Sequence, residues 1–181
     1  QNIGIADELL PRVRVNPGMK FIDSENNLLL DWPRPQEITP QGWNASYRLH
    51  QPDLERLLRK KLESYDNVSV KTGTRVASID QTGNGVDLLA HSISTDTSEK
   101  YRAQYVIGCD GANSQTRTII QSELDDYGFQ ERWLVIDLIL KKPRPDLGDH
   151  SIQFCLPDRP MTYCRGPVSY THLTLPTILL V

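Results

Sequence analysis

The sequence predicts a mixed α/β (α+β) fold, and three observations lead to this prediction. Tyr105–Ile107 is a short apolar run that stops at Gly108, which is typical of a buried strand. After the turn Cys109–Gly111, the segment Ala112–Gln121 contains no glycine or proline, and Ser114 is a suitable helix N-cap. Elsewhere, β-branched or alternating runs are separated by turn residues, so we expect the rest of the chain to consist mainly of strands and hairpins.

The first fifty residues predict one short helix followed by short strands. The apolar positions between residues 3 and 10 suit a helix that ends at Pro11. We expect strands at 13–15, 19–23 and 27–31, with a hairpin turn at 24–27. A loop follows, because three prolines and a glycine fall between residues 33 and 42.

Residues 52–62 carry the clearest helix pattern in the chain. Pro52 suits the first turn of a helix, and Leu54, Leu57, Leu58 and Leu62 then recur at helical spacing. The basic residues between positions 56 and 61 fall on the other side, so we expect them to face outward.

Further strands are expected at 68–71, 74–80, 86–90, 133–140 and 151–155, with a turn at 83–85 and a polar hairpin tip at 91–100. The run 133–140 is the most strand-like, yet Asp137 stands in its middle. A buried carboxylate is costly without a partner. Asp137 is therefore either outward-facing on an edge strand, which the pattern favours, or functional.

Composition narrows the class of protein. A chain of 181 residues is long enough for one ordinary domain, and a net charge of −3 with scattered basic residues argues against nucleic acid or an anionic membrane as partner. The three cysteines lack metal-like spacing, as do His50, His91 and His150, so no metal site is expected. We expect a soluble, cytoplasmic protein with reduced thiols. Because the chain begins without methionine, Gln1 is not expected to be the natural start.

The turn around Asp110 is the strongest candidate for chemistry. A strand, a tight turn and a helix place a carboxylate and bare backbone N–H groups at the carboxyl end of a strand, where open α/β sheets bind ligands. Asp110 suits ribose or ribityl hydroxyls, the flanking glycines allow close approach to the main chain, and Arg117 supplies charge for phosphate. The alternative is a plain Asp-Gly hairpin turn, but that requires an alternating strand afterwards, and ANSQTRTII does not alternate.

The segment GCDGANSQTR resembles the Asp-Gly motif of the flavoprotein aromatic hydroxylases, the para-hydroxybenzoate hydroxylase family. In that family the motif lies against FAD and is linked to the use of NAD(P)H. By this resemblance the cofactor-binding members are Gly108, Asp110, Gly111, Ser114 and Arg117.

Three further residues are nominated for FAD by the same resemblance. The segment YRLHQPDLERLL is similar to a family segment whose glutamine contacts the ribityl region, which implies Gln51 and, more weakly, Arg48. The main chain near Val76 would meet the adenine. The pattern alone favours a different interpretation of Gln51, as a polar residue at the entry to a helix.

The resemblance implies an interior slice, residues 1–167, of a longer enzyme. The N-terminal GxGxxG that grips the FAD pyrophosphate and the later Gly-Asp motif are both absent. We therefore expect an incomplete Rossmann-like FAD-binding domain with a β-meander, and the start of a β-rich substrate domain at about 13–47 and 132–167. The segment FCLPDRPMTYCRGP resembles the 3-(3-hydroxyphenyl)propionate hydroxylase branch.

The implied parent activity is an FAD-dependent, NAD(P)H-using monooxygenase. It transfers oxygen from O2 to a small phenolic substrate through a flavin C4a-hydroperoxide, and because the cofactor carries this chemistry no catalytic side chain is nominated. This chain alone is expected to be inactive. The alternatives are another flavoprotein with the same FAD domain, such as an epoxidase or reductase, and a non-catalytic piece that binds no cofactor. The oligomeric state stays open.

The C-terminal residues 168–181 need separate treatment. VSYTHLTLPT is similar to the one-frame translation of a transposon adapter used in sequencing libraries, so we expect a non-native tail. The alternative is a natural threonine-rich strand. No functional role is assigned to this tail.

Overall fold

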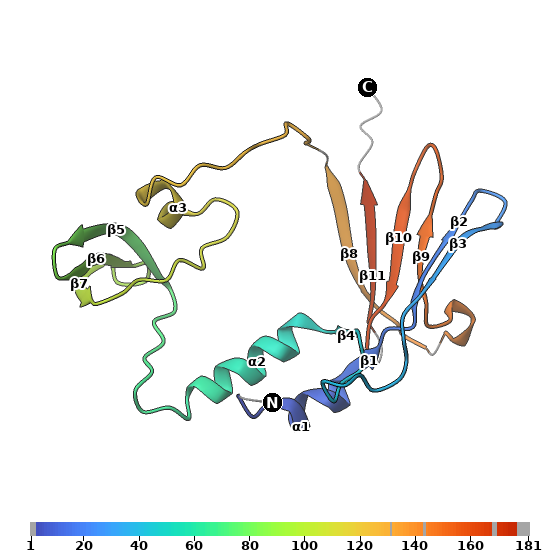
Figure 1. The fold of residues 1–181 in the computed structure, drawn as a ribbon, viewed down its shortest axis with the longest axis horizontal. Coiled ribbons are helices and arrows are strands. Elements are labelled where there is room, and N and C mark those ends of the chain that lie inside the picture. The colour runs from blue at the N-terminus through green and yellow to red at the C-terminus, as the bar shows by residue number, and fades with distance from the viewer. Residues whose placement is uncertain (1–2, 131, 143, 168–169, 177–181) are drawn as a thin grey trace. The chain divides into compact units, whose positions relative to one another are not determined.

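The computed structural model describes residues 3–130, 132–142, 144–167 and 170–176, the last range by its backbone alone. The chain divides into two compact units, one formed by residues 1–66 and 130–181 and the other by residues 67–129. Each unit is described by itself (Figure 1). Strands and helices occur in both, so the predicted mixture of α and β structure is confirmed.

The first unit contains a six-stranded sheet with the order β3-β2-β9-β10-β11-β8. Its strands are β2 (Gly18–Ile22), β3 (Leu28–Pro33), β8 (Trp133–Ile139), β9 (Ser151–Phe154), β10 (Met161–Arg165) and β11 (Tyr170–Pro176). All neighbours pair antiparallel except β2 and β9, which are parallel. Figure 1 shows β3 and β8 as the two edges. Strands from both expected sheet portions therefore lie in one sheet, and their assignment to a substrate domain stays a prediction.

The same unit also contains a two-stranded sheet, two helices and two 3-10 turns. These elements are α1 (Ala6–Leu9), the 3-10 turn η1 (Leu10–Arg12), β1 (Val13–Val15), β4 (Tyr47–Leu49), α2 (Gln51–Leu62) and the 3-10 turn η2 (Pro145–Leu147). The predicted helix of residues 52–62 is confirmed as α2, which buries Leu57. Pro11 lies inside η1 instead of ending the first helix, because a proline is tolerated in the first turn of a helix.

The second unit is an antiparallel meander followed by a short helix. The strands are β5 (Thr74–Thr82), β6 (Gly85–Ser92) and β7 (Thr97–Ala103), in the order β5-β6-β7, and the helix is α3 (Gln115–Ile119). The predicted strands at 74–80 and 86–90 are confirmed, and the polar tip is shorter than expected because both flanking strands continue into it. A bulge interrupts the pairing between Val76 and Ser78.

Two predicted strands are wrong. Tyr105–Ile107 forms no strand, and Tyr105 and Ile107 are 84% and 85% exposed instead of buried. Val68–Lys71 is likewise irregular. A strand exists only through hydrogen bonds to a neighbour, and within the described residues no strand pairs with either segment. The residue types of these two segments predicted strands, but the described part of the chain contains no neighbouring strand that pairs with them.

The C-terminal segment contributes a strand to the sheet. Residues Tyr170–Pro176 form β11, which pairs antiparallel with both β10 and β8. The backbone of this segment is a strand, as the alternative of a threonine-rich strand predicts. The adapter origin of residues 168–181 concerns the encoding DNA and stays a prediction, and residues 168–169 and 177–181 lie outside the described residues.

Candidate functional site

The Asp110 carboxylate organises the turn in which it lies. Its Oδ1 accepts a hydrogen bond from the Ser114 hydroxyl at 2.6 Å, and its Oδ2 accepts from the Thr116 backbone N–H at 2.9 Å and the Thr116 hydroxyl at 3.1 Å. These donors, the Ser114 hydroxyl first and the Thr116 amide second, lower the pKa of Asp110 well below its ordinary value. The carboxylate is therefore ionised and held in place by its own turn.

The two glycines of the motif are required by its geometry. A Cβ on Gly108 would lie 2.6 Å from the Cβ of Thr116, so only glycine fits against the start of α3. Gly111 has a φ of +78°, a left-handed conformation that glycine adopts without strain. No described atom lies within 4 Å of the position where a Cβ of Gly111 would be, so this stretch of main chain faces open space.

Ser114 and Arg117 complete the turn. Ser114 is the N-cap of α3, as predicted, and its Oγ accepts from the Arg117 backbone N–H at 2.9 Å. The Arg117 Nη2 donates to the Ala112 carbonyl at 2.5 Å. All five motif residues therefore lie together in the turn and the short helix that follows it.

Sequence reasoning missed Thr116 and Gln115. Thr116 gives two of the three hydrogen bonds that fix Asp110. The Gln115 amide donates to the Ala77 carbonyl at 3.1 Å, which ties α3 to the bulge beside Val76. The hydroxyl at position 116, two residues after a serine N-cap, was the available signal. The role of Val76 as a main-chain contact for adenine stays a prediction.

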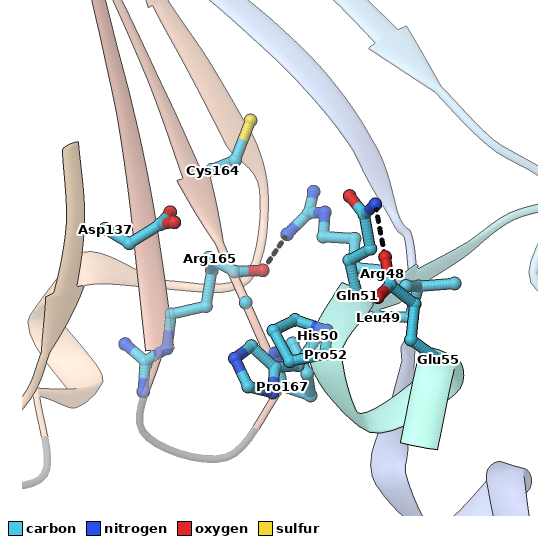
Figure 2. Close-up of a pocket in the computed structure, with 11 residues that line it drawn as sticks. Arg48, Leu49, His50, Gln51, Pro52, Glu55, Asp137, Cys164, Arg165 and Pro167 are labelled. Carbon is cyan, nitrogen blue, oxygen red and sulfur yellow. Dashed lines mark hydrogen bonds between the residues drawn. The ribbon is translucent and has the colours of Figure 1, made fainter. Parts of the chain in front are cut away.

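The first unit contains a cavity of about 560 Å³. We call it the Gln51 cavity; it is lined by Arg48, Leu49, His50, Gln51, Pro52, Glu55, Asp137, Cys164, Arg165, Gly166 and Pro167. Figure 2 shows that these residues come from β4, the start of α2 and the sheet, and that the Arg165 guanidinium points away from Arg48 and Gln51. Gln51 is the first residue of α2, and its Nε2 donates to Glu55 Oε1 at 3.1 Å. The predicted flavin contact thus lies on the wall of a cavity.

Arg48, the weaker candidate, is a half-buried crosslink. Its guanidinium donates four hydrogen bonds, all to uncharged acceptors, which are the carbonyls of Asp149 (2.5 Å), Arg165 (3.2 Å) and Gly18 (3.2 Å) and the side-chain oxygen of Asn16 (2.7 Å). Burial lowers the pKa of Arg48 from its ordinary high value. The side chain fixes β4 against β2 and β10.

His50 sits at the N-cap position of α2. Its carbonyl accepts from the backbone N–H groups of Asp53 and Leu54, and its Nδ1 lies 2.9 Å from Asp53 Oδ2. The hydrogen bond with His50, followed by that from Arg56, lowers the pKa of Asp53. Over the described ranges, no three metal-ligating side chains cluster, and no helix is long and apolar enough to span a membrane.

Asp137 lies on β8, an edge strand, and its side chain is exposed, so the favoured interpretation is confirmed. The same side chain also lines the Gln51 cavity. A functional role of Asp137 stays a prediction.

Of the seven predicted cofactor-binding residues, the structure brings five together. Gly108, Asp110, Gly111 and Ser114 lie in the turn before α3, and Arg117 lies in α3 itself. Val76 lies on β5 of the same unit, while Gln51 belongs to the other unit.

Comparisons with known proteins give a consistent picture. The family model described as "FAD binding domain" matches residues 1–173. A "Probable NADH-specific resorcinol 4-hydroxylase" from Rhodococcus jostii is 37% identical over 92% of this chain and 31% of its own length. A "3-(3-hydroxy-phenyl)propionate/3-hydroxycinnamic acid hydroxylase" from Mycolicibacterium smegmatis is 32% identical over 82% of this chain and 26% of its own length. The chain thus spans less than a third of these relatives.

Solved structures share the fold. The flavin-dependent monooxygenase PieE, in complex with FAD and substrate, superposes with a TM-score of 0.81 at 17% identity, covering 98% of this chain and 34% of PieE. The p-nitrophenol 4-monooxygenase PnpA from Pseudomonas putida gives a TM-score of 0.78 at 16% identity, over 98% of this chain and 45% of PnpA. This likeness confirms the predicted fold class.

Proposed function

Because this chain belongs to the FAD binding domain family, we propose that it forms part of an FAD-dependent, NAD(P)H-using monooxygenase that hydroxylates a phenolic ring. The observation that carries the proposal is the 37% identity to the resorcinol hydroxylase relative, which extends over 92% of the chain. The proposed activity is that of the complete protein, since this chain corresponds to about a third of that relative.

The residues present fit FAD in their chemistry. The Gln51 amide has both donors and an acceptor, which suits the hydroxyls of a ribityl chain. Gly111 leaves main chain open to an approaching ligand, and Arg117 keeps further N–H donors beyond the one given to Ala112. When bound, FAD supplies electron uptake from NAD(P)H and activation of O2. We assign Asp110 a positioning role, because three hydrogen bonds already engage its carboxylate within the turn.

The substrate is assigned to the Gln51 cavity. Its volume of about 560 Å³ falls within the usual range for small-molecule sites and has room for one aromatic ring. The relatives named above act on resorcinol and on 3-(3-hydroxyphenyl)propionate or 3-hydroxycinnamic acid. We propose a small phenol together with O2 as co-substrates. We place the enzyme in the cytoplasm, where NAD(P)H is present and its three free cysteines stay reduced.

The test is to express the complete reading frame that encodes this chain. We expect a yellow protein that retains FAD and oxidises NADH faster when resorcinol is present, with one oxygen atom from labelled O2 in the product. A protein without flavin, or one whose NADH oxidation no phenol stimulates, would refute the proposal. Substrate reduction or epoxidation without ring hydroxylation would favour the other flavoprotein classes.

A further inference from the structure

We propose that Glu55 is a positioning residue for FAD, because it holds the Gln51 amide so that the Gln51 oxygen accepts a hydrogen bond from a hydroxyl of the cofactor. This inference rests on the proposed function, in which Gln51 meets the ribityl chain. It adds Glu55, which lies outside the residues that the family resemblance nominates. It also specifies the chemistry of the contact, since the ligand group that meets the Gln51 oxygen must be a hydrogen-bond donor.

The spacing of the two residues along α2 is the first argument. Gln51 and Glu55 are four positions apart, so their side chains lie on the same face of the helix, one turn from each other. Both residues line the Gln51 cavity. The helix that carries them is anchored elsewhere, because its Leu57 is buried in the core. A substitution at position 55 therefore changes the pair and leaves the anchor of the helix in place.

The direction of the hydrogen bond is the second argument. Gln51 Nε2 donates to Glu55 Oε1 at 3.1 Å. A carboxylate only accepts hydrogen bonds, so it takes the NH2 end of the amide and turns the oxygen end away. Figure 2 shows the Gln51 nitrogen directed at Glu55 and the oxygen on the other side of the amide. Among the described residues, no group donates to this oxygen, which therefore stays available to a ligand.

Glu55 is itself oriented by a third residue on the same face of the helix. Its second oxygen, Oε2, lies 4.0 Å from Arg59 Nη2, one turn further along α2. Both side chains are at least half exposed, so this ion pair contributes little to stability. Its effect is geometric, because one oxygen of the carboxylate faces Arg59 and the other faces Gln51. The pair thus keeps Glu55 turned toward the amide that it orients.

The size of the effect follows from the freedom that Gln51 gains when Glu55 is removed. A glutamine side chain without a partner samples several rotamers and both orientations of its amide. The apparent affinity for a ligand falls in proportion to the fraction of molecules in the conformation that binds it. We expect this fraction to drop to about one half to one fifth, so Glu55→Ala should raise the Kd for FAD about two- to fivefold.

The experiment uses the complete protein freed of flavin and measures the Kd for FAD by fluorescence quenching. The variants are Gln51→Ala, Glu55→Ala and the double variant. Glu55→Ala should weaken binding in the wild-type background and have no further effect in the Gln51→Ala background, because the group that Glu55 orients is then absent. A loss of helix stability or a change of surface charge would alter the Kd equally in both backgrounds.

Three more variants separate the hydrogen bond from charge and folding. Glu55→Gln keeps a side-chain oxygen at the same reach and should give a Kd within about twofold of the wild type. The matched control is Glu63→Ala, an exposed carboxylate at the C-cap of the same helix and outside the cavity-lining residues, which should leave the Kd unchanged. If Glu55→Ala does not fold, Glu55→Met provides the same test, because methionine is a good helix former of similar length without a carboxylate.

The outcomes distinguish the two proposals. If Gln51→Ala weakens FAD binding but Glu55→Ala does not, or if Glu55→Ala acts equally in both backgrounds, the positioning role of Glu55 is wrong and the proposed function stands. If Gln51→Ala has no effect, the contact and the role of Glu55 both fail, again without touching the proposed function. A complete protein that binds no FAD refutes the proposed function itself.

Discussion

Replacing Gly108 by alanine tests whether the Asp110 turn depends on close packing. The added Cβ would lie 2.6 Å from the Thr116 Cβ, whereas carbon atoms in contact prefer about 3.5–4.0 Å. Thr116 must therefore move by about 1 Å, which would break its hydrogen bonds of 2.9 and 3.1 Å to Asp110. Overpacking of this kind costs about 1–3 kcal/mol. We expect Gly108→Ala to lower the free energy of unfolding by that amount in urea.

The partner substitution identifies the clash. Thr116→Ala removes two of the three Thr116 atoms that lie within 2.7 Å of the new Cβ but keeps its own Cβ at 2.6 Å, so it should rescue Gly108→Ala only in part. Thr116→Gly removes all three atoms and should recover about 1 kcal/mol or more in a double-mutant cycle. Gly83→Ala is the control, because its φ is outside the left-handed region and no described atom lies within 4 Å of the new Cβ. Equal stability of the alanine variants at 83 and 108 would refute the packing argument.

Three further predictions concern the charge of Asp110, the hydrogen bonds of Arg48 and the binding of FAD. The pKa of Asp110 is lower in the folded protein, so the ionised carboxylate stabilises the fold fully above the unfolded pKa of about 3.9, and this stabilisation is lost as pH falls toward the lower folded pKa. Asp110→Asn should therefore remove part of the loss of unfolding free energy at low pH, as measured by urea titrations between pH 2.5 and 7. Arg48→Lys leaves several acceptors unpaired and should cost about 1–3 kcal/mol, and an unfolding midpoint no lower than that of exposed Arg34→Lys would contradict this. Gln51→Ala should raise the Kd for FAD by about three- to tenfold, whereas an equal change in Gln121→Ala would point to a general loss of structure.

The two helices whose formation depends on residues close together in the chain were predictable from the sequence. The leucine spacing gave α2, and Ser114 gave the start of α3, because helix periodicity and capping involve residues close in the chain. The strands expected at 68–71 and 105–107 failed, because pairing depends on a partner that composition does not reveal. The parallel pairing of β2 with β9 was equally invisible, since the paired residues are far apart in sequence.

The site was predictable in part. The motif pattern located the turn, but it did not reveal that the Asp110 carboxylate accepts hydrogen bonds from Ser114 and Thr116. Asp137 was identified from the cost of a carboxylate in an apolar run, while its place on a cavity wall followed only from the order of strands in the sheet. The local sequence thus identified the candidate residues, whereas the order of the strands in the sheet determined which cavity or surface each residue lines.

The first unit is built from two separate stretches of the chain, residues 1–66 and 130–181, so its strands are not all synthesised together. Met19–Ile22 pairs with Ser151–Phe154, so the ribosome must deliver well over a hundred further residues before this part of the sheet can form. The meander of residues 67–129 needs only its near neighbours and can form during that interval. Until β9 emerges, the edge of β2 that β9 later covers is unpaired, and an unpaired edge can pair with other chains.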